Sequence, residues 1–361
     1  MTTLDRYVLK IFVRNLALVL LTLVALYGLV EFVEKVDDLI EYQAGLKYYL
    51  LYPLYHLPVI LSNTLPMAVL LATFATIGGF SRTSQLTAIF CCGITLSRIS
   101  RPLFMCSVIL ALLAMAANLW LVPWSSRESH YILRTEIRGN TPQAEEAHDL
   151  YFRDGNRIIS VGQSFPAKGV VLDLTVVEFN DQFMPLKRID AEKATHVRNG
   201  QWRLENVVTW DFHPQTRDVT AYARNPELLF DLARQPSEML QLWDRPEDLT
   251  IGELFAFTAK LSSEGYDPKA YRMETQMRFS GAVIPIIMVL VGIPYAPQRG
   301  RNASFALGIV ISLIIFASYF ILHAVFSVFG AIAVLPPLLA AWAANILMTL
   351  VGTWFLLRVD N

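Results

Sequence analysis

Three arginines that follow the third apolar stretch have side chains suited to binding phosphate. On a helical wheel of 100° per residue, Arg127, Arg134 and Arg138 lie within about 20° of one direction. An arginine fork donates two parallel hydrogen bonds, which matches the paired oxygens of a phosphate group. If the stretch is helical, its basic face therefore predicts contact with a phosphorylated lipid headgroup. The alternative is a solvated or salt-bridged surface, because exposed charge usually needs no ligand.

A second segment is suited to contact with a protein partner. Residues 83–93 can form a short helix in which Ser84 is the cap and Gly93 is the end. The apolar face of this helix would consist of Leu86, Ile89 and Phe90. Such a helix between two membrane spans can dock into a groove of a cytoplasmic partner. It can equally lie in the bilayer interface or pack against its own helices.

Motifs of the common catalytic centres are missing from the sequence. It contains no GxxxxGK[ST] loop for ATP phosphates and no GxSxG, HExxH or GxGxxG. Adjacent Cys91–Cys92 is not a zinc motif, and the six histidines form no ligand-spaced pair. His56 and His323 lie in apolar stretches, where a neutral, hydrogen-bonded histidine is favoured over a proton relay because neither has a carboxylate within its span. We therefore expect no catalytic centre, no metal site and no cofactor bound by this chain.

The composition is that of a membrane protein with a soluble insertion. Of 361 residues, 54% are hydrophobic and 17% are charged, against about 45–50% and about 25% in soluble domains. A net charge of −1 offers no basic surplus for binding nucleic acid. Most charged side chains, 42 of 61, lie within residues 124–275. The chain therefore divides into a first membrane half, residues 1–123, an insertion, residues 124–275, and a second membrane half, residues 276–361.

Six apolar stretches are long enough to cross a bilayer, which takes about 20 helical residues. Three precede the insertion and three follow it: Ile11–Val33, Leu54–Phe80, Pro102–Ser126, Phe279–Gln298 and two within Asn302–Leu357. Pro53, Pro58 and Pro66 interrupt the second apolar run, so we expect an interfacial approach before its span. Gly330 and Pro336–Pro337 mark the expected break between the last two spans.

Charges in the loops predict the orientation of the chain in the membrane. Lys and Arg concentrate in cytoplasmic loops, and here they dominate the N-terminus and the loops after the second and fourth spans. The alternate loops are acidic or uncharged; Glu31 lies at the outer end of the first span, and Glu34 and Asp37 follow it. We therefore expect both termini in the cytoplasm and the insertion outside.

Hairpin signals in the insertion predict an all-β domain. Asp154–Gly155 and Asn199–Gly200 each separate two short alternating stretches, which is typical of two-residue turns. Val170–Phe179 is rich in β-branched residues. Strands at this spacing favour a sandwich or jelly roll over a parallel α/β sheet. After them, Thr250 and Glu253 have the spacing of a capping box and predict a helix that leads back to the membrane.

The order of these parts resembles the permease subunits of the lipopolysaccharide export ABC transporter, the YjgP/YjgQ family. The start LDRYVLK, the loop RTSQLTAIFCCGIT and the segment LTIGELFAFTAKLSSEGYDPKAYRMETQMRFSGAVIPIIMVLVGIPY are similar to the corresponding family segments. The start, together with the end LPPLLAAWAANILMTLVGTWFLLR, is more similar to the LptG-type subunit than to the LptF-type subunit. The resemblance implies an α-helical membrane protein with six transmembrane helices (3+3) and an inserted periplasmic all-β domain that is jelly-roll-like.

The resemblance also implies a function and a set of partners. This chain would be a non-catalytic inner-membrane permease that extracts lipopolysaccharide and passes it to a periplasmic bridge for export to the outer membrane. The implied partners are a homologous LptF-type permease, a cytoplasmic LptB-type ABC ATPase dimer that binds ATP and Mg, a single-span LptC-type jelly-roll subunit and the LptA-type bridge protein. No nucleic acid is expected. ATP binding would move the coupling helix and narrow a cavity that holds the lipid.

Two groups of residues would take part in the function that the resemblance implies. The ATPase-coupling group is Ser84, Gln85, Leu86, Ile89, Phe90 and Gly93. Family members commonly carry Glu where this chain has Gln85, so an ion pair with the ATPase is not expected here. The lipopolysaccharide-binding group is Lys35, Arg127, Arg134 and Arg138. Family members can carry several basic residues at the outer end of the first span, where this chain has only Lys35 in EFVEKVDD, so the phosphates would rely more on the three arginines or on the partner permease.

Two other classes of function remain open from the residues themselves. One is a membrane scaffold or sensor whose outer domain binds a ligand and which needs no ATPase. The other is an ion-coupled transporter, which the lack of acidic residues within the spans and of inverted-repeat signs disfavours.

Overall fold

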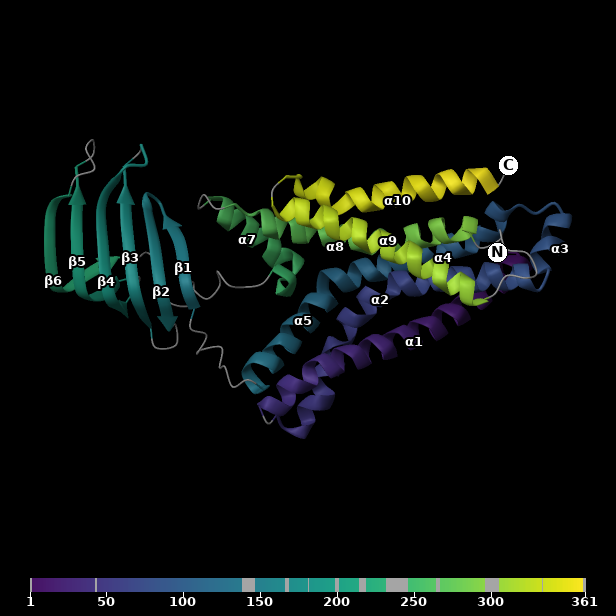
Figure 1. Ribbon diagram of the computed structural model, residues 1–361, viewed down its shortest axis with the longest axis horizontal. Coiled ribbons are helices and arrows are strands. Elements are labelled where there is room, and N and C mark those ends of the chain that lie inside the picture. The colour runs from purple at the N-terminus through teal and green to yellow at the C-terminus, as the bar shows by residue number, and fades with distance from the viewer. Residues whose placement is uncertain are drawn as a thin grey trace. The chain divides into compact units, whose positions relative to one another are not determined.

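The chain forms two compact units in the computed structural model (Figure 1). The structure describes residues 2–42, 44–137, 147–165, 169–180, 182–198, 201–213, 219–231, 246–263, 267–295, 305–332 and 334–359. The helical unit combines three segments, Met1–His130, Pro246–Phe255 and Lys269–Asn361. The β unit combines two, Tyr131–Arg245 and Ala256–Pro268. The N-terminal and C-terminal parts of the chain therefore share one unit, and the β unit is an insertion.

Long apolar helices build the helical unit. They are α1 (Thr3–Glu41), α2 (Leu46–Arg82), α4 (Leu96–Ala116) continued by the π-helix η1 (Ala117–Leu121) and by α5 (Val122–Tyr131), α8 (Lys269–Tyr295), α9 (Phe305–Ala331) and α10 (Pro337–Val359). Six described helices, counting 96–131 as one, are long and apolar enough to cross a membrane. The prediction of six spans in two groups of three is therefore confirmed. A short helix, α3 (Gln85–Cys91), lies between α2 and α4.

The second span differs from its prediction. Pro53, Pro58 and Pro66 lie inside one continuous helix, α2, so the expectation of a separate interfacial approach is wrong. Proline is tolerated in a membrane helix where neighbouring groups satisfy the backbone around it. Here the Ser125 hydroxyl of α5 donates to the carbonyl of Tyr55, between two of these prolines. This contact joins α5 to the proline-containing part of α2.

Close packing between the two membrane halves gives the helical unit one core. Val8, Phe12, Leu103 and Met288 are fully buried within one apolar cluster, and they come from α1, α4 and α8. Gly330 allows α9 and α10 to approach, since a Cβ there would lie 2.6 Å from that of Ala340. The predicted break between α9 and α10 is confirmed, and α9 continues one residue beyond this glycine.

The start of α7 (Ile251–Ser263) and the 3₁₀ turn η4 (Pro246–Asp248) before it belong to the helical unit. Arg278 of α8 holds this stretch, because its guanidinium donates to the carbonyls of Pro246, Glu247 and Leu249 at 3.0, 3.0 and 2.6 Å. The predicted capping box is confirmed: the Thr250 N–H donates to Glu253 Oε2 at 2.7 Å and the Glu253 N–H donates to Thr250 Oγ1 at 3.5 Å. The helix therefore begins where the sequence predicts.

The β unit is one antiparallel sheet whose described strands follow chain order. The strands are β1 (Ala147–Asp154), β2 (Arg157–Phe165), β3 (Val170–Phe179), β4 (Pro185–Arg198), β5 (Gln201–Phe212) and β6 (Val219–Asp231). Asp154 pairs with Arg157 and Arg198 with Gln201, which confirms both hairpins; the turn residues 199–200 lie outside the described part. The core of this sheet includes Trp202, fully buried.

An inserted all-β domain is thus confirmed, and its described strands form a meander. A jelly roll or sandwich would divide them between two sheets. In this chain each connection is short enough for successive strands to pair directly, which favours a sequential order.

Candidate functional site

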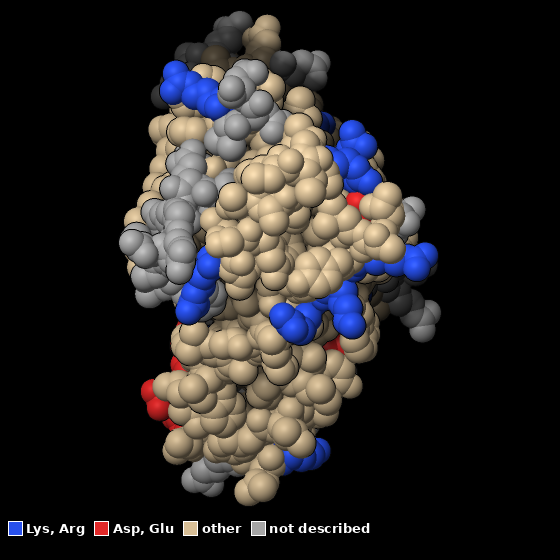
Figure 2. Space-filling view, turned by 90° about the vertical axis from the view of Figure 1, so that its right-hand side faces the viewer, with Lys and Arg blue, Asp and Glu red and all other residues tan. Residues whose placement is uncertain are grey.

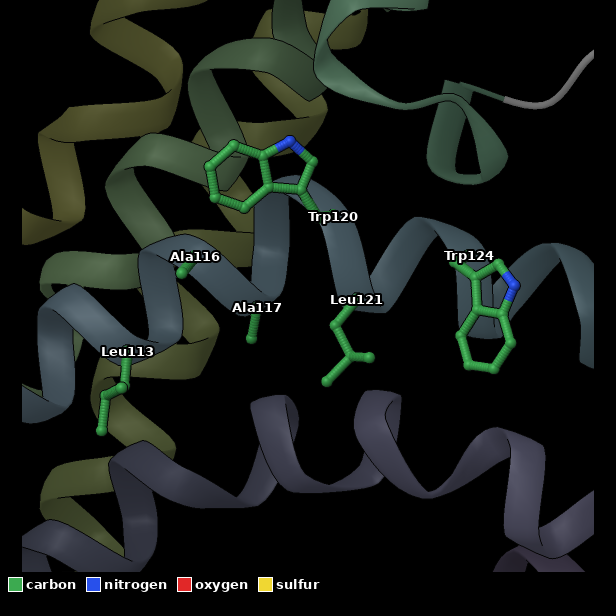
Figure 3. A pocket seen from close by; sticks show the side chains of 6 residues that line it. All are labelled: Leu113, Ala116, Ala117, Trp120, Leu121 and Trp124. Carbon is green, nitrogen blue, oxygen red and sulfur yellow. The ribbon is translucent and has the colours of Figure 1, made fainter.

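An open apolar groove runs along one continuous helix of the helical unit. It has a volume of about 430 Å³ and is lined by Leu113, Ala116, Ala117, Trp120, Leu121 and Trp124 (Figure 3). The two alanines create the hollow because their side chains are short, and the leucines and tryptophans form its walls. Among the described residues, only alanine, leucine and tryptophan line the groove, so its chemistry suits hydrocarbon chains.

Part of the groove lies on a segment with a different helix geometry. η1 has the wider winding of a π-helix, a form that is often found at functional sites. Figure 3 shows Leu113, Ala117, Leu121 and Trp124 pointing to one side of the helix and Trp120 to the other. Trp120 and Trp124 are 63% and 49% exposed although they are large and apolar. Exposed tryptophans of this kind are typical of the membrane interface.

Polar side chains from three helices meet at the end of α5 near the groove. The Trp124 ring lies edge-on to Tyr55 of α2, with centroids 5.7 Å apart. Beside Tyr55, His56 lies between two partners: its Nε2 is 3.7 Å from Glu31 Oε1 of α1, and its Nδ1 is 3.4 Å from Ser129 Oγ of α5. The Tyr52 hydroxyl also donates to Glu31, at 3.4 Å. We call Glu31, Tyr52, His56 and Ser129 the polar cluster.

Sequence reasoning missed the carboxylate next to His56. The sequence places Glu31 near the outer end of the first span and among the acidic residues that follow it, but α1 continues to Glu41, so Glu31 lies well within the helix and faces α2. The signal was present: Glu31 and His56 are equally far along the chain from the α1–α2 turn at residues 42–45. In an antiparallel helix pair, such residues lie at the same level.

Arg127 pairs with acidic and carbonyl groups of its own chain. One guanidinium nitrogen donates to Glu253 Oε2 at 2.8 Å and to the carbonyl of Asp248 at 3.0 Å. Nearby, the Asp248 carboxylate accepts a hydrogen bond from Ser126 at 2.7 Å and lies 3.0 Å from His130 Nδ1. For Arg127, these contacts favour the salt-bridged alternative over an arginine that is free for phosphate.

The same contacts shift the titration of Glu253. Partial burial raises the pKa of its carboxyl, but hydrogen bonds from the N–H and hydroxyl of Thr250 and from Arg127 outweigh this effect. The pKa therefore lies below its ordinary value of 4.5. The carboxylate is charged at neutral pH, which holds the start of α7 against α5.

Of the other three residues in the predicted phosphate-binding group, the structure describes the side chain of Lys35 only. The segment after α5 is a second π-helix, η2 (Ile132–Ile137), so a wheel of 100° per residue does not extend along it. The side chain of Arg134 and the whole of Arg138 lie outside the described part of the chain. Lys35 is 27% exposed at its side chain, with its Nζ 3.7 Å from Glu34. The phosphate-binding role of these residues stays a prediction.

The predicted short helix is present as α3, but its apolar face is divided. Leu86 is 2% exposed and packs with Ile89 against the core of the helical unit, whereas Phe90 is 41% exposed. Ser84 occupies the N-cap position in the left-handed region (φ 58°) and makes no capping bond with its side chain. Gly93 ends the helix with φ 75°, as predicted. Gln85 accepts a hydrogen bond from Tyr7, so its amide is used within the chain.

Basic side chains gather at the end of the helical unit that carries α3 and both termini (Figures 1 and 2). Figure 2 shows Lys and Arg around an area of uncharged residues. Exposed basic residues near these termini and α3 are Arg6, Lys10, Arg14, Arg82, Arg101 and Arg358. Asp5, by contrast, is buried against Arg98. We call this surface the basic end.

The sequence is similar to known proteins along nearly its whole length. Residues 6–358 match the family described as the lipopolysaccharide export system permease LptF/LptG. The lipopolysaccharide export system permease protein LptG of Escherichia coli strain K12 is 20% identical over 357 residues, which cover 98% of this chain and 98% of that protein. LptG of Haemophilus influenzae strain Rd is 18% identical over 357 residues, which cover 99% of this chain and 98% of that protein. The similarity includes both membrane halves and the insertion.

Proposed function

Because the chain belongs to the lipopolysaccharide export system permease family LptF/LptG, we propose that it is the LptG-type permease subunit of an ABC transporter that extracts lipopolysaccharide. It is a multi-pass protein of the inner membrane with six spans. Its sequence has no P-loop, so we propose that a separate ATPase binds ATP and Mg and supplies the energy. The lipid passes to a periplasmic bridge on its way to the outer membrane.

The observation that carries this function is the apolar groove with the polar cluster near its end. Lipopolysaccharide has acyl chains joined to a charged headgroup, and the groove with its two exposed tryptophans suits the acyl chains. Burial of a chain is worth about 0.8 kcal/mol per CH₂. Moving acyl chains from the bilayer to an apolar groove is therefore close to neutral in free energy, and the work of transport falls mainly on the headgroup.

The headgroup phosphates are proposed to contact Lys35, Arg127, Arg134 and Arg138. Arg127 can take part only by exchanging Glu253 for a phosphate, since one guanidinium nitrogen already donates to that carboxylate. Arg134 and Arg138 are therefore the stronger candidates of the group.

The basic end supports the proposed orientation and partners. Lys and Arg are retained on the cytoplasmic side of membrane proteins, so we place both termini and α3 in the cytoplasm and the β unit in the periplasm. The exposed Phe90 then faces the ATPase dimer, and Ser84, Gln85, Leu86, Ile89 and Gly93 shape the helix that presents it. An LptF-type permease, an LptC-type subunit and an LptA-type bridge complete the proposed assembly.

Site-specific photo-crosslinking tests this function in cells that make lipopolysaccharide. A photoreactive residue in place of Leu121, in the groove, should form a lipopolysaccharide adduct. The same residue in place of Leu350, 63% exposed on α10, is the matched control and should form none. Equal adducts at the two positions, or none at Leu121 in an exporting strain, would overturn the assignment of the groove.

A further inference from the structure

The first turns of α1 are attached to the chain on both sides of α3. Asp5 Oδ1 and Oδ2 accept hydrogen bonds from Arg98 Nη1 and Nη2 at 2.7 and 3.2 Å. Arg98 lies in the first turn of α4, which follows α3. Tyr7 donates to Gln85, the first residue of α3, at 3.3 Å, and its ring stacks on Phe80 with centroids 5.9 Å apart. Two polar contacts therefore join α1 to the α3–α4 corner.

The Asp5–Arg98 contact has a defined geometry. The Thr2 N–H donates to Asp5 Oδ2 at 2.8 Å, and the Asp5 N–H donates back to Thr2 Oγ1 at 3.4 Å. Thr2 Oγ1 also accepts from Arg98 at 3.4 Å. The Asp5 side chain is 12% exposed. A two-point arginine–carboxylate contact with one partner fixed in this way resists both sliding and rotation.

The middle of α1 has a largely exposed apolar surface. Leu18, Leu21 and Leu29 are 60%, 69% and 60% exposed. Beyond Asn15, which donates to Thr76 at 3.1 Å, the next polar contact between a described side chain of α1 and another helix is at Glu31. A helix of 39 residues is about 58 Å long at 1.5 Å per residue. A tilt of a few degrees at its inner end therefore moves its outer end by several ångströms.

We propose that Asp5 and Arg98 are positioning residues that make α1 follow the movement of the α3–α4 corner. A push on α3 reaches α1 through the Asp5–Arg98 contact, with Tyr7–Gln85 as a second attachment. This moves the outer half of α1, which carries Glu31 of the polar cluster. The inference rests on the proposed function only for the source of the push, which is the partner ATPase.

The experiment measures the position of α1 in the full transporter complex in lipid nanodiscs. Spin labels replace Leu29 of α1 and Leu112 of α4, after Cys91, Cys92 and Cys106 are changed to serine. Nucleotide trapping should change the Leu29–Leu112 distance in the wild-type background. The change should be lost in Asp5→Asn, in Arg98→Gln and in the double variant. Lys193→Gln removes an ion pair in the β unit and is the control, which should behave as wild type.

A second readout separates positioning from a purely structural role. Lipopolysaccharide released per ATP hydrolysed should fall at least fivefold in each single variant, while the ATPase rate and the thermal midpoint stay near wild type. The double variant should be no worse than either single variant, because the two residues form one contact. Additive losses, a parallel fall of ATPase rate and thermal midpoint, or a retained distance change would each overturn the inference.

The isolated chain provides a test that needs no ATPase. Without Asp5 or Arg98, the distribution of Leu29–Leu112 distances should be broader than in wild type and in Lys193→Gln. If the distribution in the isolated variants is the same as in wild type, the Asp5–Arg98 contact does not position α1, and the inference is overturned whatever the complex shows. If no ATPase accompanies the wild-type chain, the proposed function fails, while a broadened distribution still supports the attachment of α1.

Discussion

Glu31 and His56 face each other across the α1–α2 hairpin, with Oε1 and Nε2 3.7 Å apart and both side chains less than one fifth exposed. Polar contacts between membrane helices are worth about 0.6 kcal/mol on average in double-mutant cycles, and up to about 1.7 kcal/mol. We predict that Glu31→Gln and His56→Gln each lower the free energy of unfolding by an amount in this range.

The measurement for this pair is reversible unfolding of the purified chain in mixed micelles. The double variant should lose less than the sum of the two single variants, because each single change already breaks the contact. Strict additivity would show that Glu31 and His56 act independently.

Phe90 and Leu86 should respond differently to a charged substitution. Phe90→Asp changes an exposed side chain, so the chain should fold normally and lose co-purification of the ATPase. Leu86→Asp places a carboxylate in the core, which costs several kcal/mol, so the chain itself should be destabilised. Pull-down yield and thermal midpoint, measured side by side, distinguish the two effects. Normal ATPase recovery with Phe90→Asp would argue against the coupling role of α3.

Arg134 and Arg138 should matter more for lipopolysaccharide binding than Arg127. The double change Arg134→Glu, Arg138→Glu reverses two charges in the proposed phosphate-binding group, so photo-crosslinking to lipopolysaccharide from Leu121 should fall severalfold. Arg127→Gln should have a smaller effect, because Arg127 already pairs with Glu253. An unchanged yield in the double variant would return these arginines to the solvated alternative.

Acid should weaken the attachment of the start of α7 to α5. The folded-state pKa of Glu253 lies below 4.5, so its contribution to stability is present above that pH and is lost as the pH falls through the folded value. An exposed ion pair such as Arg127–Glu253 contributes roughly 0.2–1 kcal/mol to the free energy of unfolding.

The thermal midpoints of wild type and Glu253→Gln, measured from pH 7 down to pH 3, test this effect. The wild-type advantage should be constant above pH 4.5 and should shrink below it. Arg127→Gln removes one of the hydrogen bonds that lower the folded-state pKa, so in that variant the advantage should be smaller and its loss should be complete at a higher pH. An advantage that persists unchanged at pH 3 would contradict the role of the carboxylate.

The membrane spans and the hairpins were predictable because each is encoded by residues that follow one another in the sequence. Apolar stretches of about 20 residues identify membrane spans whatever their neighbours are, and turn residues such as Gly155 identify hairpins locally. The path of α2 was not predictable in this way. Whether a proline interrupts a membrane helix depends on the helices that pack around it.

The candidate site was less predictable than the fold because its contacts join distant segments. Arg127 finds its partner 126 residues later in the chain, at Glu253. The apolar residues of α3 correctly predict a short helix. The sequence does not indicate that Leu86 packs against the core of its own chain while Phe90 is exposed. The π-helix η1, which carries three of the residues that line the groove, has no signature in the residue pattern.

The order of the strands has a consequence for biosynthesis. Every pairing among the described strands of the β unit joins consecutive strands, and such nearest-neighbour contacts form quickly because little chain entropy is lost in making them. The core of the helical unit instead needs Met288 and Ala344, synthesised last, beside Phe12 and Leu103, synthesised first. During translation, the insertion can mature hairpin by hairpin, while the early membrane helices must wait in the bilayer for the late ones.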